Sequence, residues 1–145
     1  MPTLSQQILA RAAGLAPGEV PAPGELVTVA PDRVMVHDSI GPAVIRMLRE
    51  DLGVERLPDP DRVSVVIDHV APAANLATAE NQQLLRRWVA DQGIASFFDA
   101  GRGICHQLLV QEGLARPGTV VVGTDSHSTT YGAVGAFGTG MGATD

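Results

Sequence analysis

The second half of the chain alternates regularly between short apolar stretches and longer helical stretches. The apolar stretches are VSVVI (63–67), IASFF (94–98) and TVVVG (119–123), and each has the length of a buried strand. The helical stretches between them span residues 75–93 and 103–113. Strands that alternate with helices of this length form βαβ units. The sequence therefore predicts an α/β fold, with a mostly parallel sheet flanked by helices.

The first half of the chain shows the same kinds of element with weaker patterning. Residues 3–13 predict a short helix, because Thr3 and Gln6 have the spacing of a capping box. Residues 14–25 are rich in proline and glycine, which predicts a loop. The other expected elements are two β-prone stretches (26–30 and 33–36) and a helix (41–53).

Composition narrows the classes of protein that fit this pattern. The chain has 145 residues, of which 45% are hydrophobic, and this is enough for one globular domain. Its net charge of −6 argues against nucleic acid or an anionic membrane as a partner. The sequence contains no apolar run of membrane-spanning length and no signal-peptide pattern, so we expect a cytoplasmic protein.

The residue types that are scarce also constrain the chemistry. All ten basic residues are arginine, so Schiff-base chemistry and a lysine-bearing phosphate loop are excluded within this chain. The single cysteine, Cys105, fits a reducing compartment, and we expect it to be an inert buried thiol.

Potentially reactive residues follow two of the expected strands directly. Asp68 and His69 come after the strand at 63–67, and the run Asp125-Ser126-His127 comes after the strand at 119–123. In open parallel sheets, ligands bind beyond the carboxyl ends of the strands. We therefore expect both groups on one rim. His106, near the start of a helix, should lie within hydrogen-bond reach of Asp125, directly or through one water.

Several simpler readings of these residues remain open. The Asp-Ser-His run could serve only as turn and capping residues, since no G-x-S-x-G elbow accompanies it. GTGMGA (138–143) is a weak match to a dinucleotide fingerprint, and a loop that lets backbone approach a ligand is the safer reading. A zinc site is conceivable, but no H-x-x-x-H or C-x-x-C spacing supports it, so no residue is assigned as a metal ligand.

Three stretches carry a family resemblance. They are VMVHDSIGP (34–42), VIDHVAPAAN (66–75) and the segment 101–145, which contains GTDSHSTTYGAVGAFGTGMGATD. These stretches resemble the aconitase family, and within it the large subunits of 3-isopropylmalate dehydratases and homoaconitases. The likeness runs from about residue 3 to the end of the chain.

The resemblance implies a hydro-lyase of leucine or lysine biosynthesis. Such an enzyme moves a hydroxyl group between adjacent carbons of a 2-hydroxy di- or tricarboxylate by dehydration and rehydration. The resemblance also implies a [4Fe-4S] cluster that acts as a Lewis acid, and a separate small subunit as partner. The substrate stays open between an isopropyl-bearing acid and a longer carboxylate.

The resemblance also implies roles for individual residues. His69 is similar to the acid that protonates the departing hydroxyl, with Asp68 tuning it. An imidazole suits this task because it exchanges protons near neutral pH. His106 and Asp125 resemble a second Asp/His pair. The substrate-contacting positions of the family correspond to Ser126, His127 and His37.

One departure from the family pattern is large. Relatives hold the iron–sulfur cluster through three cysteines in later segments, and Cys105 matches none of them. We therefore expect residues 1–145 to form a single incomplete N-terminal domain of a larger subunit, inactive alone. The main alternative is a non-catalytic remnant or interaction domain derived from this family. A nucleotide-binding module using GTGMGA ranks last.

Overall fold

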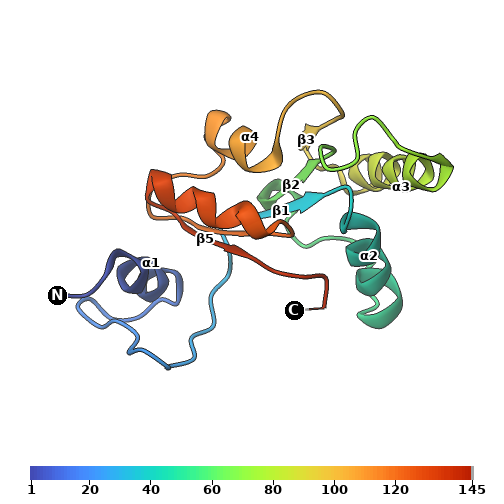
Figure 1. Ribbon diagram of the computed structural model, residues 1–145. Coiled ribbons are helices and arrows are strands. Elements are labelled where there is room, and N and C mark those ends of the chain that lie inside the picture. The colour runs from blue at the N-terminus through green and yellow to red at the C-terminus, as the bar shows by residue number, and fades with distance from the viewer. Residues whose placement is uncertain (145) are drawn as a thin grey trace.

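A five-stranded sheet forms the centre of the computed structural model, which describes residues 1–144 (Figure 1). The strands run in the order β3-β2-β1-β4-β5, and every neighbouring pair is parallel. The expected α/β class is thus confirmed, and the sheet is parallel throughout. The strands are β1 (Arg33–His37), β2 (Val63–Val66), β3 (Ser96–Phe98), β4 (Val120–Gly123) and β5 (Phe137–Gly140).

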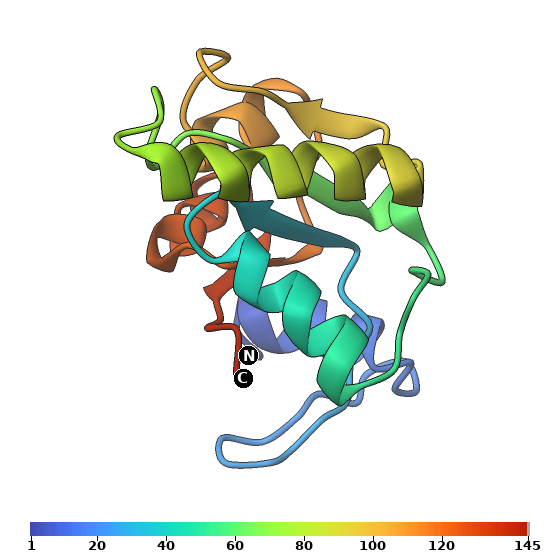
Figure 2. The ribbon, with the colours of Figure 1, turned by 90° about the vertical axis from the view of Figure 1, so that its right-hand side faces the viewer.

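Helices cover both faces of this sheet. Figure 2 shows α2 and α3 in front of the sheet, while α4 and the 3-10 segment η3 lie behind it. Because side chains alternate along a strand, Val36 and Val65 pack toward the first pair of helices. Their neighbours Met35 and Val66 pack toward the second pair. The helices are α1 (Leu4–Ala12), α2 (Gly41–Arg46), α3 (Leu76–Gln92) and α4 (Cys105–Gln111), and η3 spans Ser126–Val134.

The strand order creates a place for a site. The chain builds β1, β2 and β3 outward in one direction, and then returns to add β4 on the other side of β1. The connections that leave β1 and β4 therefore diverge, and such a reversal opens a crevice at the carboxyl ends of the two strands. No helix among residues 1–144 has the length and apolar character to cross a membrane.

Local signals set the ends of the helices. The capping box expected at the start of α1 is present, with Thr3 and Gln6 bonding each other's backbone N–H. Asn75 caps α3 by accepting from the Thr78 N–H, and Gly93 ends this helix in a left-handed conformation. The helix expected at 41–53 begins as α2 and continues as a π-helical turn over Met47–Asp51.

Two parts of the sequence interpretation were wrong. Residues 26–30 form no strand, because this β-prone stretch finds no neighbouring strand to pair with, and Leu26 is almost fully exposed. The glycine-rich stretch that was expected to be a loop instead contains η3 and the edge strand β5. Its glycines hide the strand from any pattern of alternating apolar residues.

Glycine at position 138 is required by close packing in this stretch. A Cβ atom there would lie 2.3 Å from the Ser128 carbonyl oxygen and 3.0 Å from Tyr131 Cβ. We expect Gly138→Ala to lower the free energy of unfolding by about 1–3 kcal/mol, measured by urea denaturation. Gly132→Ala is the matched control, since nothing lies within 4 Å of its added Cβ. Equal stabilities of the two variants would contradict this packing.

Candidate active site

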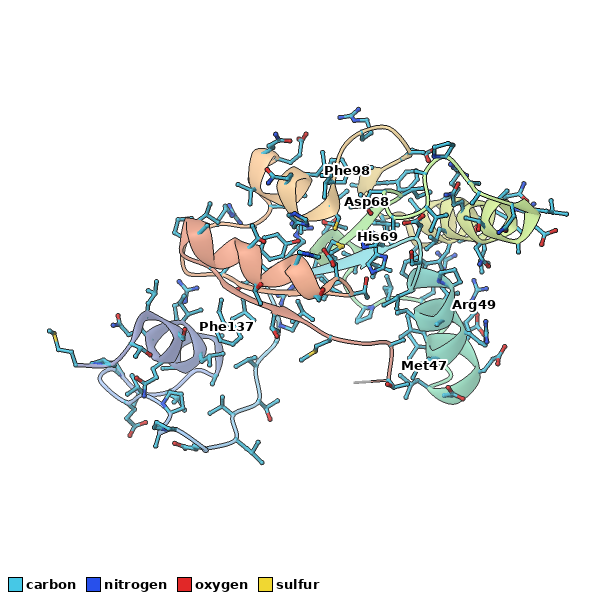
Figure 3. The ribbon with its side chains drawn as sticks, viewed as in Figure 1. Met47, Arg49, Asp68, His69, Phe98 and Phe137 are labelled. Carbon is cyan, nitrogen blue, oxygen red and sulfur yellow. The ribbon has the colours of Figure 1, made fainter. Side chains whose placement is uncertain are left out.

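Six side chains gather at the carboxyl ends of the central strands and the start of α4. Figure 3 shows two of them, Asp68 and His69, just beyond the end of β2. They come from the turn after β2, from α4 and from the segment after β4, so the topology brings together residues that are distant in sequence. We call this group the rim site, and its members are Asp68, His69, Cys105, His106, Asp125 and His127.

The Asp68–His69 pair has a fixed orientation. His69 Nδ1 lies 2.8 Å from Asp68 Oδ1, and the backbone N–H of Cys105 donates to Asp68 Oδ2 at 2.6 Å. The carboxylate is thus held from α4 while it holds the imidazole. With Nδ1 engaged, His69 Nε2 points across the rim site and lies 3.8 Å from Asp125 Oδ1. The His69 side chain keeps 32% of its surface exposed, so a ligand can reach it.

Asp125 is the hub of the rim site. Its Oδ2 lies 3.3 Å from His106 Nδ1, the pair that the sequence places within hydrogen-bond reach. Its Oδ1 lies 3.1 Å from His127 Nδ1 and accepts from the His127 N–H. Burial alone would raise the pKa of Asp125, but the hydrogen bonds from His127, Cys105 and His106 outweigh burial and lower this pKa. Asp125 is therefore a carboxylate at neutral pH.

His37 lies beneath the rim site and is 3% exposed. Its Nδ1 accepts from the Ser39 N–H, and its Nε2 bonds the Thr124 carbonyl oxygen at 3.1 Å. Its ring stacks on that of His69 with a centroid separation of 3.7 Å. Burial, and then the nearness of His69, lower the pKa of His37, so this ring stays neutral. In this conformation His37 contacts His69 and not the open surface.

Asp38 is an important residue that the sequence analysis did not single out. Its carboxylate accepts from the backbone N–H groups of Asp68, His69 and Val70, and Gln82 adds a side-chain donor at 3.4 Å. Asp38 is 4% exposed, and burial would raise its pKa, but these donors outweigh burial and lower it. Asp38 thereby fixes the turn that carries the Asp68–His69 pair.

We expect Asp38→Asn to lower the free energy of unfolding at pH 7 by about 2–3 kcal/mol, because the amide leaves buried N–H donors without acceptors. Asp38 has a folded-state pKa below its ordinary 3.8. The stabilisation by Asp38 is therefore fully present above pH 3.8, the ordinary pKa. It is lost as the pH falls through the lower pKa of the folded state. Denaturation curves recorded between pH 7 and pH 2 should converge for variant and wild type. The exposed Asp51→Asn serves as control and should follow the wild type; a constant gap for Asp38→Asn would contradict the assignment.

Ser126 follows Asp125 directly in the chain but is not a member of the rim site. Its side chain is exposed at the start of η3, next to a shallow pocket of about 380 Å³. Thr124, Thr129 and Thr139 also line this pocket. The residues around this pocket include several side chains that carry hydroxyl groups and no charged side chain.

The rim site is rich in carboxylates and poor in fixed positive charge. Asp68, Asp125 and the supporting Asp38 bond only to imidazoles, amides and a thiol. Within residues 1–144, no arginine hydrogen bond or salt bridge reaches these three carboxylates. The polar groups that the site itself offers are carboxylates, imidazoles and a thiol, which can bind and exchange protons.

The thiol in the rim site is unsuited to an iron–sulfur cluster. Cys105 is fully buried, and its Sγ lies 3.5 Å from Asp125 Oδ2. Burial, together with Asp68 and Asp125, raises the pKa of this thiol. Iron–sulfur clusters are held by several cysteine thiolates, whereas the chain has one cysteine. The residues of this chain do not form a ligand set for such a cluster.

The sequence profile of the aconitase family (aconitate hydratase) matches residues 8–145. The chain belongs to the aconitase family. It is 57% identical to the 3-isopropylmalate dehydratase large subunit of Herpetosiphon aurantiacus and 56% identical to the homoaconitase large subunit of Thermus thermophilus. Each comparison covers 99% of this chain, but only 33% and 32% of the two relatives. The chain thus spans about a third of the length of these relatives.

A more distant relative gives the same picture. The 3-isopropylmalate dehydratase large subunit 1 of Methanopyrus kandleri is 46% identical over 99% of this chain and 33% of its own length. The names of these relatives indicate hydro-lyase enzymes with more than one subunit. The resemblance stated from the sequence is thereby confirmed at the level of the family.

Proposed function

We propose that this chain forms one wall of the active site of a hydro-lyase that isomerises a 2-hydroxy di- or tricarboxylate by dehydration and rehydration. The aconitase-family match over residues 8–145 carries this proposal. The substrate class follows the named relatives, so 3-isopropylmalate and homocitrate are the compounds to test. The pathway would be leucine or lysine biosynthesis, in the cytoplasm.

In this proposal, His69 gives a proton to the hydroxyl group that leaves the substrate. The Asp68 carboxylate holds Nδ1–H of His69, so Nε2 is the atom that carries the transferred proton. The buried ring of His37, stacked beneath it, keeps the His69 ring in place. An acid placed in this way acts mainly in the transition state, where the bond to the leaving oxygen breaks.

Asp125 and its two imidazoles form the second proton-holding unit. His106 is mostly buried and bonds Asp125 Oδ2, so it orients the carboxylate. His127 keeps 71% of its side chain exposed and is placed to donate to a substrate carboxylate. Ser126, beside its pocket, is proposed to bind the same end of the substrate. His37, which the resemblance assigns to substrate contact, is proposed here to act through His69.

Other parts of the enzyme are required for turnover. Proteins of the aconitase family bind a [4Fe-4S] cluster, which supplies Lewis-acid assistance to the leaving hydroxyl when it is bound. The cysteine ligands of the cluster would come from segments outside this chain. We propose that residues 1–145 form an incomplete N-terminal domain of the large subunit. The relatives are named large subunits, so we propose a small subunit as the protein partner.

A chimeric subunit tests the proposed function. Residues 1–145 replace the matching third of the Herpetosiphon aurantiacus large subunit, which is then combined with that organism's small subunit and supplied with iron and sulfide. We expect turnover of 3-isopropylmalate or homocitrate. A folded chimera that gains the iron–sulfur chromophore but shows no turnover with either compound would favour the alternative, a non-catalytic interaction domain.

A further inference from the structure

We propose that Gln82 is a positioning residue for the Asp68–His69 pair, an inference that rests on the proposed hydro-lyase function. Its side chain is polar, yet it lies in the interior and is 4% exposed. The amide nitrogen Nε2 donates to the Val70 carbonyl oxygen at 2.8 Å and to Asp38 Oδ2 at 3.4 Å. Gln82 thereby connects α3 to the turn that carries the proposed proton donor.

The residue pattern of α3 explains why this side chain points inward. The buried residues of the helix recur at helical spacing and form one face, and they are Gln82, Leu85, Trp88, Val89 and Gln92. The three apolar members pack in one cluster with side chains of β1 and β2. A glutamine therefore lies at each end of an apolar face. A buried amide is costly without partners, so each glutamine needs hydrogen bonds where it lies.

Gln82 and Asp38 together hold the turn after β2. Asp38 Oδ1 accepts from the His69 N–H, and Oδ2 accepts from the Val70 N–H. Gln82 donates to that same Oδ2 and also to the Val70 carbonyl oxygen, so the carboxylate and the amide hold both backbone groups of Val70. The backbone of this turn sets the direction of the His69 side chain. In this conformation His69 Nε2 lies 3.8 Å from Asp125 Oδ1.

Positioning of this kind affects the rate because a proton donor has to reach the leaving oxygen at hydrogen-bond distance. A displacement of about 1 Å from the productive geometry can lower a rate about 100-fold. Gln82 is buried beneath the turn, so it does not need to touch the substrate. Its effect on the reaction passes through His69.

The same helix offers a matched control in Gln92. This residue is 8% exposed, accepts from the Leu57 N–H at 2.8 Å and donates to the Glu55 carbonyl oxygen at 2.9 Å. Both partners lie in the loop before β2, and Gln92 is the last residue of α3. Methionine is similar in length to glutamine and has no amide. Gln82→Met and Gln92→Met therefore each remove a buried amide, but only the first removes a bond to the reactive turn.

Amide hydrogen exchange of the 145-residue chain tests the structural part of the proposal. We expect Gln82→Met to lower the protection of the His69 and Val70 N–H groups about 3- to 10-fold relative to the amides of β4, because the turn loses a hydrogen bond. Gln92→Met should leave this ratio unchanged, since a general loss of stability affects both sets of amides. The unmodified chain should also show nuclear Overhauser effects between the Gln82 side-chain amide and Val70, a measurement that does not depend on how a variant folds.

Steady-state kinetics of the chimeric subunit test the functional part. Gln82→Met is expected to lower kcat about 10- to 100-fold and to change KM by less than about twofold, whereas Gln92→Met should keep the kcat of the unmodified chimera. Equal kcat values for the two variants, or an unchanged exchange ratio in Gln82→Met, would overturn the positioning role. If the unmodified chimera shows no turnover, the proposed function fails, and the exchange ratio alone then decides whether Gln82 holds the turn.

Discussion

Replacement of His69 by alanine in the chimeric subunit is expected to lower kcat by about 10²–10⁴-fold, with a much smaller change in KM. The reason is that a group that protonates a leaving hydroxyl acts in the transition state and contributes little to ground-state binding. Nδ1 of His69 is already held by Asp68, so alanine removes an oriented acid and not only a bulky ring. Steady-state kinetics on the chosen substrate give both constants.

Ser126→Ala in the same chimera provides the comparison. This exposed side chain lies by the threonine-rich pocket and is not a member of the rim site. We expect its loss to raise KM strongly, since it is proposed to bind a carboxylate of the substrate. Small and equal effects of His69→Ala and Ser126→Ala would contradict both proposed roles.

The second large effect concerns the 145-residue chain by itself. After anaerobic treatment with iron and sulfide it is expected to stay colourless and to show no dehydration of 3-isopropylmalate or homocitrate, even with a small subunit added. The chain has one cysteine, and this residue is fully buried with its sulfur against Asp125. A cluster held by three cysteine thiolates cannot be assembled from it.

The reconstituted chimera is the control for this experiment, since it contains the remaining two thirds of the relative. It should develop the brown chromophore under the same conditions. A stable brown chromophore together with turnover by the 145-residue chain would contradict the proposal that essential ligands and catalytic groups lie in other segments.

Much of the fold could be predicted because two of its interior strands, β2 and β4, are mostly apolar on both faces. The run that forms β2 is buried throughout, and the run that forms β4 is buried except at Val122, which is partly exposed. The helix between residues 75 and 93 has clear start and stop residues. Strand β5 escaped prediction because close approach of backbone selected glycine at position 138, which removed the hydrophobic signal. Propensity alone was misleading at residues 26–30, where no partner strand is present.

The candidate site was predictable in outline for a topological reason. Residues that directly follow parallel strands share one edge of the sheet, so the meeting of His69 with Asp125 follows from their positions in the sequence. The supporting contacts were not predictable. The role of Asp38 depends on three backbone N–H groups of a distant turn, and the stacking of His37 on His69 depends on how two strands lie side by side.

A double-mutant cycle on Asp68 and His69 in the chimera tests the central claim most directly, namely that the two residues act as one proton-donating unit. Asp68→Asn alone is expected to lower kcat, because the amide no longer stabilises the oriented imidazole. In the His69→Ala background, the same substitution should change kcat by less than about twofold, because the residue through which Asp68 acts is already absent. If the two losses in kcat multiply, Asp68 and His69 act independently and the proposed pair is wrong.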